Sequence, residues 1–143
     1  MTTSFSSDYA TARSKFVETA AFAKAEMASF RHELLGPRGE ELVTDVAWLG
    51  PRSAKHVLVT ISGVYGVEGF VGSAVQIEWL RRSEQQRLQS DSAVLLIHAM
   101  NPYGFAWLRR TNEDNIDLNR NWMDFDKPLP VNAGYEELTP FCR

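Results

Sequence analysis

The segment His56-Val-Leu-Val-Thr-Ile-Ser62, followed by Gly63-Val-Tyr-Gly-Val-Glu-Gly-Phe-Val-Gly72, decides the fold class of this chain. Its first part is a continuous apolar run, which is typical of a strand buried on both faces of a sheet. A helical pattern then runs from Phe70 to about Gln89, and residues 93–100 form a second apolar run. A strand, a glycine loop, a helix and a strand in this order predict a βαβ unit with a parallel strand pair.

The residues before this unit predict one long helix and one more strand. Apolar residues recur at steps of three and four between residues 8 and 34, and a Gly-Pro pair then ends the pattern. Weak alternation over residues 42–48 predicts a strand. Because only a short turn separates it from the strand at 56–62, we expect these two strands to pair antiparallel.

Composition and charge narrow the function classes. The 143 residues suit a single domain, 1–143, with 44% hydrophobic and 23% charged residues. A net charge of −3 argues against nucleic-acid binding, which needs a basic surface. Cys142 is the single cysteine, so neither a disulfide framework nor a Cys-rich zinc site is expected. The sequence has no leader with a basic and an apolar part and no run of about 20 apolar residues, so we expect a cytoplasmic protein without a membrane partner.

The glycine loop carries the first candidate for chemistry. Glycine recurs at every third position from 63 to 72, which does not match the Gly-x-Gly-x-x-Gly spacing of dinucleotide-binding proteins. Glu68 follows the end of a predicted buried strand, where ligand sites of open α/β sheets lie. It is either a metal ligand or general base there, or a residue that favours the N-terminus of the helix. We expect His98, near the end of the next strand, either to point into the same crevice or to be a structural residue.

A second candidate lies in the segment from Asn101 to Trp122, which contains Arg109, Arg110 and Arg120. A guanidinium group binds a carboxylate through two parallel hydrogen bonds. Asn119 and Arg120 lie between two apolar residues, which predicts an anchored backbone at this point. The alternative is a solvated loop whose arginines pair with its own acidic residues, and such pairs stabilise a protein little. These observations alone favour neither interpretation.

Three motifs follow one another along the chain, namely Ser62-Gly-Val-Tyr-Gly-Val-Glu-Gly-Phe70, Asn101-Pro-Tyr-Gly-Phe105 and Asp117-Leu-Asn-Arg-Asn-Trp122. Together they cover most of residues 55–140, and in this order they resemble the zinc carboxypeptidase family. The nearest branch is a bacterial group of carboxypeptidase-like domains of unknown function, related to the succinylglutamate desuccinylase and aspartoacylase branch. The resemblance implies a three-layer α/β/α fold with a mixed sheet, of which this chain is the N-terminal half and hence an incomplete domain.

The resemblance also implies a zinc site. In the family, a His-x-x-Glu motif in the glycine loop supplies two zinc ligands, and Glu68 matches the glutamate. Tyr65 stands at the position of the histidine. A phenol must lose a proton with a pKa of about 10 to bind zinc, whereas neutral imidazole binds it readily. Zinc binding by this chain therefore rests on one matching ligand, Glu68, and one substituted position, Tyr65.

For the substrate, Asn119 and Arg120 match the family pair that holds a terminal carboxylate. Arg110, with Arg109 as the other candidate, matches the arginine that polarises the scissile carbonyl. The later zinc-binding histidine of the family and its water-activating glutamate have no matching motif here. The resemblance thus implies the N-terminal portion of a metallohydrolase for peptide or acyl-amino-acid amide bonds next to a free carboxylate, and this portion is expected to be inactive alone.

Two alternatives remain. The chain is either a non-catalytic remnant that binds a small carboxylate or peptide, or an interaction module that associates with itself through an exposed sheet edge. Little regular structure is expected after residue 101, apart from a helix at about 133–138.

Overall fold

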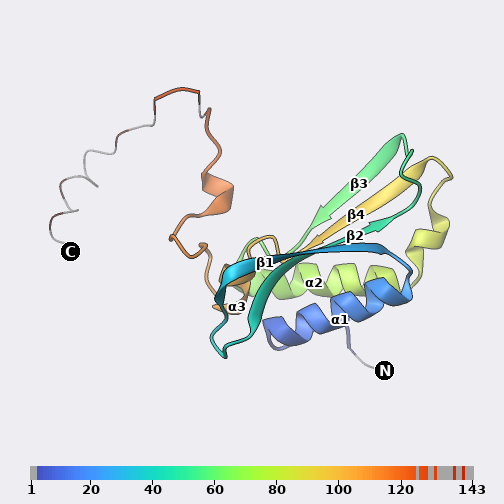
Figure 1. Cartoon of the computed structure of the whole chain (residues 1–143), viewed down its shortest axis with the longest axis horizontal. Coiled ribbons are helices and arrows are strands. Elements are labelled where there is room, and N and C mark those ends of the chain that lie inside the picture. The colour runs from blue at the N-terminus through green and yellow to red at the C-terminus, as the bar shows by residue number, and fades with distance from the viewer. Residues whose placement is uncertain (1–2, 125, 129–130, 132–136, 138–139, 141–143) are drawn as a thin grey trace.

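The structure, a computed structural model, describes residues 3–124, 126–128, 131, 137 and 140. Over these residues, two helices pack against one face of a mixed four-stranded sheet (Figure 1). None of the described helices is long and apolar enough to span a membrane. The elements are α1 (Tyr9–Phe22), β1 (Glu26–Leu35), β2 (Glu41–Leu49), β3 (His56–Ile61), α2 (Gly66–Arg81), the 3₁₀ helix η1 (Glu84–Arg87), β4 (Ser92–His98), α3 (Pro102–Ala106) and the 3₁₀ helix η2 (Leu118–Arg120).

The strands lie in the order β1-β2-β4-β3. β3 runs parallel to β4, with His56 opposite Ser92 and Ile61 opposite Ile97, and α2 connects the two strands. The predicted βαβ unit and the α/β class with a mixed sheet are therefore confirmed. The predicted pairing of β2 with β3 is wrong, because β4 lies between them and itself pairs antiparallel with β2.

The helix predicted over residues 8–34 is correct only for its first half. α1 begins after Asp8, whose carboxylate accepts a hydrogen bond from the backbone N–H of Thr11 (2.8 Å). The helix ends at Phe22. Lys24 then adopts a φ of +58°, where the chain turns from α1 into β1. The following residues form β1, because there they gain an antiparallel ladder against β2. Such tertiary pairing outweighs a local helical pattern.

The core lies between the sheet and the two helices. α1 contributes Phe16 and Ala20, which are fully buried, and α2 contributes Ile77 and Leu80. Burying one side chain as large as Phe16 stabilises a fold by about 1.5–3 kcal/mol. The strands complete the cluster with Ala47, Leu49, Val94 and Leu96.

The opposite face of the sheet is not covered by any described helix. Thr60 faces α2, because its hydroxyl accepts a hydrogen bond from the Gln76 side chain (3.2 Å). Side chains alternate along a strand, so Val57, Val59 and Ile61 point to the other face, where they are 44–50% exposed. The prediction that this strand is buried on both faces is therefore wrong. Of the three expected layers, the described residues form the sheet and one helix layer.

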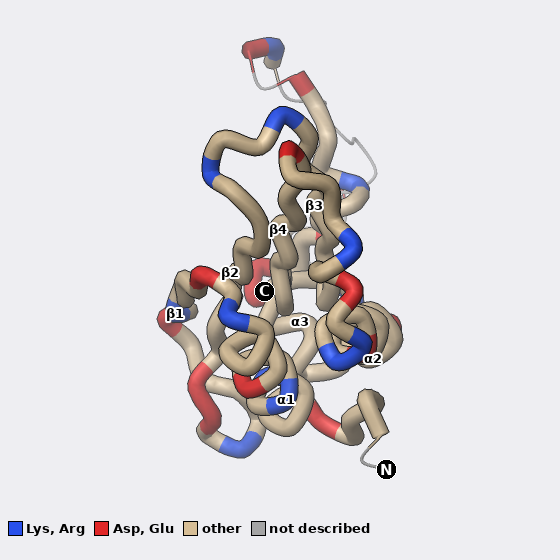
Figure 2. The backbone as a smooth tube through the Cα atoms, turned by 90° about the vertical axis from the view of Figure 1, so that its right-hand side faces the viewer, with Lys and Arg blue, Asp and Glu red and all other residues tan. Residues whose placement is uncertain are grey.

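β3 is also the last strand of the described sheet, so one of its edges has no neighbouring strand there. Neither β3 nor β4 carries a Lys, Arg, Asp or Glu along its length (Figure 2). Charged residues are a common means of protecting an edge strand from pairing with another chain. This edge lacks that protection.

Beyond η2 the chain extends away from the sheet (Figure 1). Leu118 is half-buried, but Trp122 is 85% exposed. The predicted anchoring of the Asn119-Arg120 backbone between two apolar residues is thus found on one side only. The helix predicted at 133–138 lies outside the described residues, apart from Glu137.

Candidate functional site

Candidate side chains from two distant segments meet beyond the carboxyl end of β3. Tyr65 immediately precedes α2, and Glu68 lies in the first turn of that helix. Arg109 and Arg110 follow α3, and Arg120 ends η2. They surround a pocket of about 280 Å³, at the lower limit of the usual size of small-molecule sites. The lining residues are Tyr65, Gly66, Val67, Glu68, Leu108, Arg109, Arg110 and Arg120.

Asn119 is the predicted site residue that does not line this pocket. Its backbone N–H donates a hydrogen bond to Asp117 (3.0 Å), and its backbone carbonyl accepts one from the Arg120 guanidinium (3.3 Å). Asn119 therefore shapes the turn that carries Arg120.

The glycines of the loop allow the two segments to approach closely. Gly66 donates its backbone N–H to the carbonyl of Arg109 (2.9 Å). A Cβ atom on Gly66 would lie 2.5 Å from the backbone nitrogen of Arg109 and 2.6 Å from the carbonyl oxygen of Gly104. Gly63 has a φ of +66°, which favours glycine. Close packing of backbone on backbone accounts for these glycines without a bound phosphate.

The Asn101-Pro-Tyr-Gly-Phe105 motif packs beneath the glycine loop and holds it in place. Asn101 is buried and accepts a hydrogen bond from the backbone N–H of Gly104 (2.8 Å), which caps α3. Its side-chain amide also donates to the carbonyl of Val64 in the glycine loop (3.2 Å). Phe105 is fully buried. The motif thus fixes the loop that ends in Tyr65, although none of its five residues lines the pocket itself.

Asp117 lies beside the pocket and binds two of the predicted site residues. The Tyr65 hydroxyl donates to Asp117 Oδ1 (3.0 Å), and Arg110 Nε donates to Asp117 Oδ2 (2.6 Å). The guanidinium of Arg110 also lies 5.2 Å from the centre of the Tyr65 ring. Burial raises the pKa of Asp117, but the hydrogen bonds from Arg110 and Tyr65 outweigh it and hold the pKa below its ordinary value. The ion pair with Arg110 is of the kind that the solvated-loop alternative predicted, whereas the hydrogen bond from Tyr65 to Asp117 was not predicted from the sequence.

The other two arginines of the pocket donate hydrogen bonds to uncharged oxygen atoms, and Arg109 also lies 5.9 Å from the centre of the Tyr103 ring. Arg109 Nη2 donates to the side-chain oxygen of Asn115 (3.1 Å) and to the Thr111 hydroxyl (3.4 Å). Arg120 donates to a backbone carbonyl. Glu68 is exposed, and no described residue forms a hydrogen bond or an ion pair with it. Glu68 brings a carboxylate to the same pocket, but it forms no ion pair with Arg109 or Arg120, so these two guanidinium groups have no paired carboxylate among the described residues.

These residues do not fit a zinc site. Among the described residues, no three His, Cys, Asp or Glu side chains are close enough together to hold a metal ion. Glu68 is one suitable ligand, and the hydroxyl of Tyr65 is engaged with Asp117. A catalytic zinc needs three protein ligands and a water molecule.

His98 does not supply a missing ligand. It is fully buried, stacks on Phe16 at 4.5 Å between ring centres, and has its Nε2 2.9 Å from the Ser73 hydroxyl. Of the two alternatives for His98, the structural residue is confirmed and the position in the crevice of Glu68 is not, because its place on β4 turns the ring toward the helices. Burial lowers the pKa of His98 to about 4, so the ring is neutral at pH 7.

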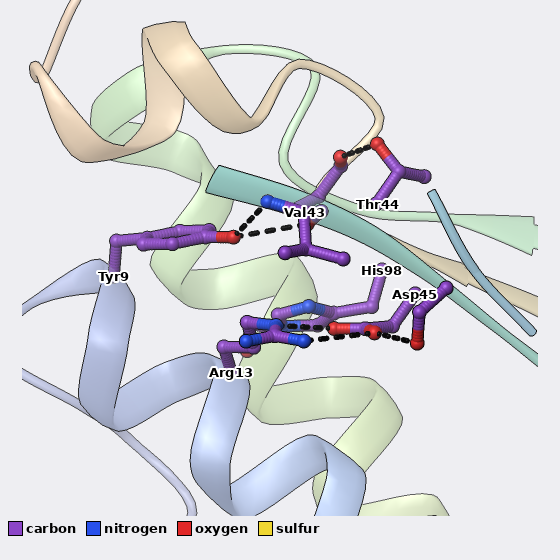
Figure 3. A network of polar contacts seen from close by, with 9 residues as sticks. Tyr9, Arg13, Val43, Thr44, Asp45 and His98 are labelled. Carbon is purple, nitrogen blue, oxygen red and sulfur yellow. Dashed lines mark hydrogen bonds and ion pairs between the residues drawn. The ribbon is translucent and has the colours of Figure 1, made fainter. Parts of the chain in front are cut away.

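His98 belongs to a buried polar network that joins α1 to the sheet (Figure 3). Arg13 Nε donates to the fully buried Asp45 (2.7 Å), and the Ser29 hydroxyl donates to the same carboxylate (2.6 Å). The Tyr9 hydroxyl exchanges hydrogen bonds with the backbone of Val43, accepting from its N–H (2.7 Å) and donating to its carbonyl (2.9 Å). These contacts fix the position of the helix and do not reach the arginine pocket.

The family model described as "Protein of unknown function (DUF2817)" matches residues 5–142. The chain therefore belongs to this family. No curated protein matches the sequence.

Several solved structures resemble the fold. A Zn-dependent exopeptidase from Parabacteroides distasonis has 13% identity and a TM-score of 0.48, and the match covers 76% of this chain and 44% of the exopeptidase chain. A glutaminyl cyclase from Tannerella forsythia has 12% identity and a TM-score of 0.46, covering 87% and 46%. A glutaminyl cyclase from Porphyromonas gingivalis has 16% identity and a TM-score of 0.45, covering 73% and 50%. The chain thus spans half or less of the length of these three structures.

Proposed function

We propose that this chain is the substrate-binding, N-terminal portion of a zinc-carboxypeptidase-like hydrolase that acts on a peptide or acyl-amino-acid amide bond next to a free carboxylate. Alone, it binds the carboxylate and does not cleave the bond. The observation that carries the proposal is the gathering of Arg109, Arg110 and Arg120 around one pocket, from positions that the resemblance to this family had singled out.

The chemistry of the pocket supports a carboxylate as the ligand. Guanidinium groups are permanently charged and match the planar geometry of a carboxylate. Arg120 contacts only a backbone carbonyl within the described chain, so its charge is available to a ligand. Arg109 and Arg110 are candidates for holding the carbonyl of the amide bond in the whole hydrolase, and in this portion alone they also offer guanidinium groups to the carboxylate. The volume of about 280 Å³ suits a short ligand such as an N-acylated amino acid.

No hydrolytic step is assigned to this chain. Glu68 is the one well-suited zinc ligand at the pocket, and the described residues supply no further set that completes a zinc site. A zinc ion at this place would need ligands from elsewhere, and the absence of activity by the chain alone follows from the same requirement.

A titration with N-acetylglycine, followed by NMR chemical shifts, tests the proposal. An exposed arginine pocket of this kind predicts a dissociation constant on the order of 1–10 mM, because an affinity of 1 mM requires about 4 kcal/mol. The methyl ester of the same compound should not bind, since it lacks the charge. Arg120→Ala should abolish binding, whereas Arg87→Ala should not, because Arg87 pairs with Glu84 far from the pocket. Equal binding of N-acetylglycine by the Arg120 variant would refute the proposed carboxylate site. Cleavage of the amide bond by the isolated chain would refute the proposed inactivity.

We propose a second role for the uncovered edge of the sheet, namely association between two copies of the chain. The observation that favours it is β3, an uncharged edge strand with exposed apolar side chains on its uncovered face. Two such strands can pair edge to edge without bringing like charges together.

A further inference from the structure

We propose that Asp117 is an internal ligand of the arginine pocket, which an incoming carboxylate must displace. This inference rests on the function proposed above, because it describes how the same pocket is kept closed to anions. The reasons are the contacts that the Asp117 carboxylate makes, the state of the arginines around it, and the way in which its segment is tethered.

The Asp117 carboxylate receives the hydrogen bonds that a bound substrate carboxylate would be expected to receive. Oδ2 accepts from the guanidinium of Arg110, and Oδ1 accepts from the hydroxyl of Tyr65 and from the backbone N–H of Asn119. The side chain of Asp117 is 16% exposed, while that of Arg110 is 59% exposed. The arginine is therefore open to solvent, and its Nε–H is already engaged by a carboxylate of the same chain.

Among the three arginines of the pocket, Arg110 is the one that a described carboxylate neutralises. Arg109 and Arg120 bind uncharged oxygen atoms. A ligand that entered the pocket would meet these two charges first and would then compete with Asp117 for Arg110. The guanidinium of this pair is open to solvent, and an exposed ion pair is weak, so an external carboxylate can replace Asp117.

The segment that carries Asp117 is held by hydrogen bonds on both sides. Displacement of Asp117 from Arg110 would therefore also affect other residues of the site. Residues 112–116 form a closed turn, in which the Asn112 side chain accepts from the N–H of Ile116 (2.8 Å) and the Asn112 N–H donates to the Ile116 carbonyl (3.0 Å). On its other side, Asp117 caps η2, which carries Arg120. A carboxylate that displaces Asp117 from Arg110 is therefore coupled to the position of Arg120.

Asp117→Asn tests the inference. Asparagine keeps a side-chain oxygen that can accept from the N–H of Asn119 and is an equally good helix cap, but it gives up the charge that holds Arg110. N-acetylglycine should bind this variant about two- to fivefold more tightly than it binds the native chain, because the competing ion pair is removed. Asp124→Asn is the matched control. Asp124 also accepts from the backbone N–H two residues later (3.2 Å) and loses the same charge, but its ion-pair partner is Lys127 and not an arginine of the pocket. Its affinity should stay unchanged.

The outcomes separate the two proposals. If the native chain binds, Arg120→Ala does not, and Asp117→Asn binds equally or more weakly, the internal-ligand role is refuted while the carboxylate pocket stands. If both Asp variants gain affinity equally, the gain is a general effect of charge and the internal-ligand role is again refuted. If neither the native chain nor any variant binds, both proposals fail.

A measurement on the native chain guards against a variant that does not fold. The ¹⁵N–¹H resonance of Arg110 Nε and the ¹³C resonance of the Asp117 carboxylate should both shift along the same saturation curve as the ligand binds. The Asp124 carboxylate should not shift. A pair that is only structural would leave the resonances of Arg110 and Asp117 unchanged at saturation, which would overturn the inference.

Discussion

Mild acid is expected to destabilise the fold through His98. Burial lowers the pKa of this ring to about 4, against an ordinary value of 6.5 in an unfolded chain. The unfolded state therefore takes up the proton more readily, so stability is lost as the pH falls below about 6.5 and continues to fall until about pH 4. These two values give a loss of about 2 kcal/mol between pH 7 and pH 5. The protonated ring would have to remain stacked on Phe16 in a site that water does not reach.

The assay is urea unfolding at pH 7 and at pH 5, followed by circular dichroism and analysed as a two-state transition. The native chain should lose about 2 kcal/mol of unfolding free energy between the two values. His98→Gln should be less stable at pH 7, because the packing and the contact with Ser73 are altered, but its stability should change much less with pH. His56→Gln is the matched control, since His56 lies exposed at the start of β3 and its replacement should leave the loss intact. An equal loss in the native chain and in the His98 variant would refute the reasoning.

Three further perturbations test other parts of the fold. Gly66→Ala should lower the unfolding free energy by about 1–3 kcal/mol, because its Cβ would lie 2.5 Å from the backbone nitrogen of Arg109 and overpacking of this kind strains the backbone; thermal unfolding measures it. Arg13→Ala should cost about 3 kcal/mol, because it leaves the charge of the buried Asp45 without its partner; urea unfolding at pH 7 measures this loss. Val59→Lys should shift the chain toward the monomer in light scattering, if the edge of β3 joins two copies as proposed.

Each of these variants has a control on the same kind of residue. Val67→Ala changes the next, exposed position of α2 and should alter stability by less than about 0.5 kcal/mol. Arg82→Ala removes an exposed ion pair with Glu78, which should change the stability far less than Arg13→Ala does. Phe22→Lys removes an exposed apolar side chain away from the sheet edge and should leave the oligomeric state unchanged. A monodisperse monomer of the native chain would contradict the proposed self-association outright.

The sequence was sufficient for the features that depend on local order along the chain. The βαβ unit could be predicted because an apolar run, a helical pattern and a second apolar run follow one another within residues 56–98. The arginine segment could be singled out because guanidinium groups beside turn residues are typical of an anion site. The sequence also places a glycine loop between the strand and the helix. The reason for Gly66, the close approach of the Arg109 backbone, lies more than 40 positions further along the chain.

The features that could not be predicted depend on partners that are distant in the sequence. Residues 26–35 have a helical spacing of apolar residues, and only the ladder with β2 makes them a strand. The apolar run of β3 is the same whether or not another layer covers it. The direction of His98 follows from the register of β4, and the engagement of Tyr65 by Asp117 follows from the path of a loop. A shift of one residue in the register of β4 would turn His98 to the other face, and a shift of a few ångströms in the loop would break the contact of Tyr65 with Asp117. Local sequence patterns do not encode shifts of this size.

Because β3 pairs with another strand on one side only, its own amides allow paired and unpaired N–H groups to be compared by hydrogen exchange. The N–H of Ser62 donates to the carbonyl of Ile97 in β4 (2.9 Å), and backbone groups of a strand point alternately to its two neighbours. The N–H groups of Val57, Val59 and Ile61 therefore point to the open edge, while those between them are held by β4. In the isolated chain, slow and fast exchange should alternate from residue to residue along this one strand, and any strand added at the edge would abolish the alternation.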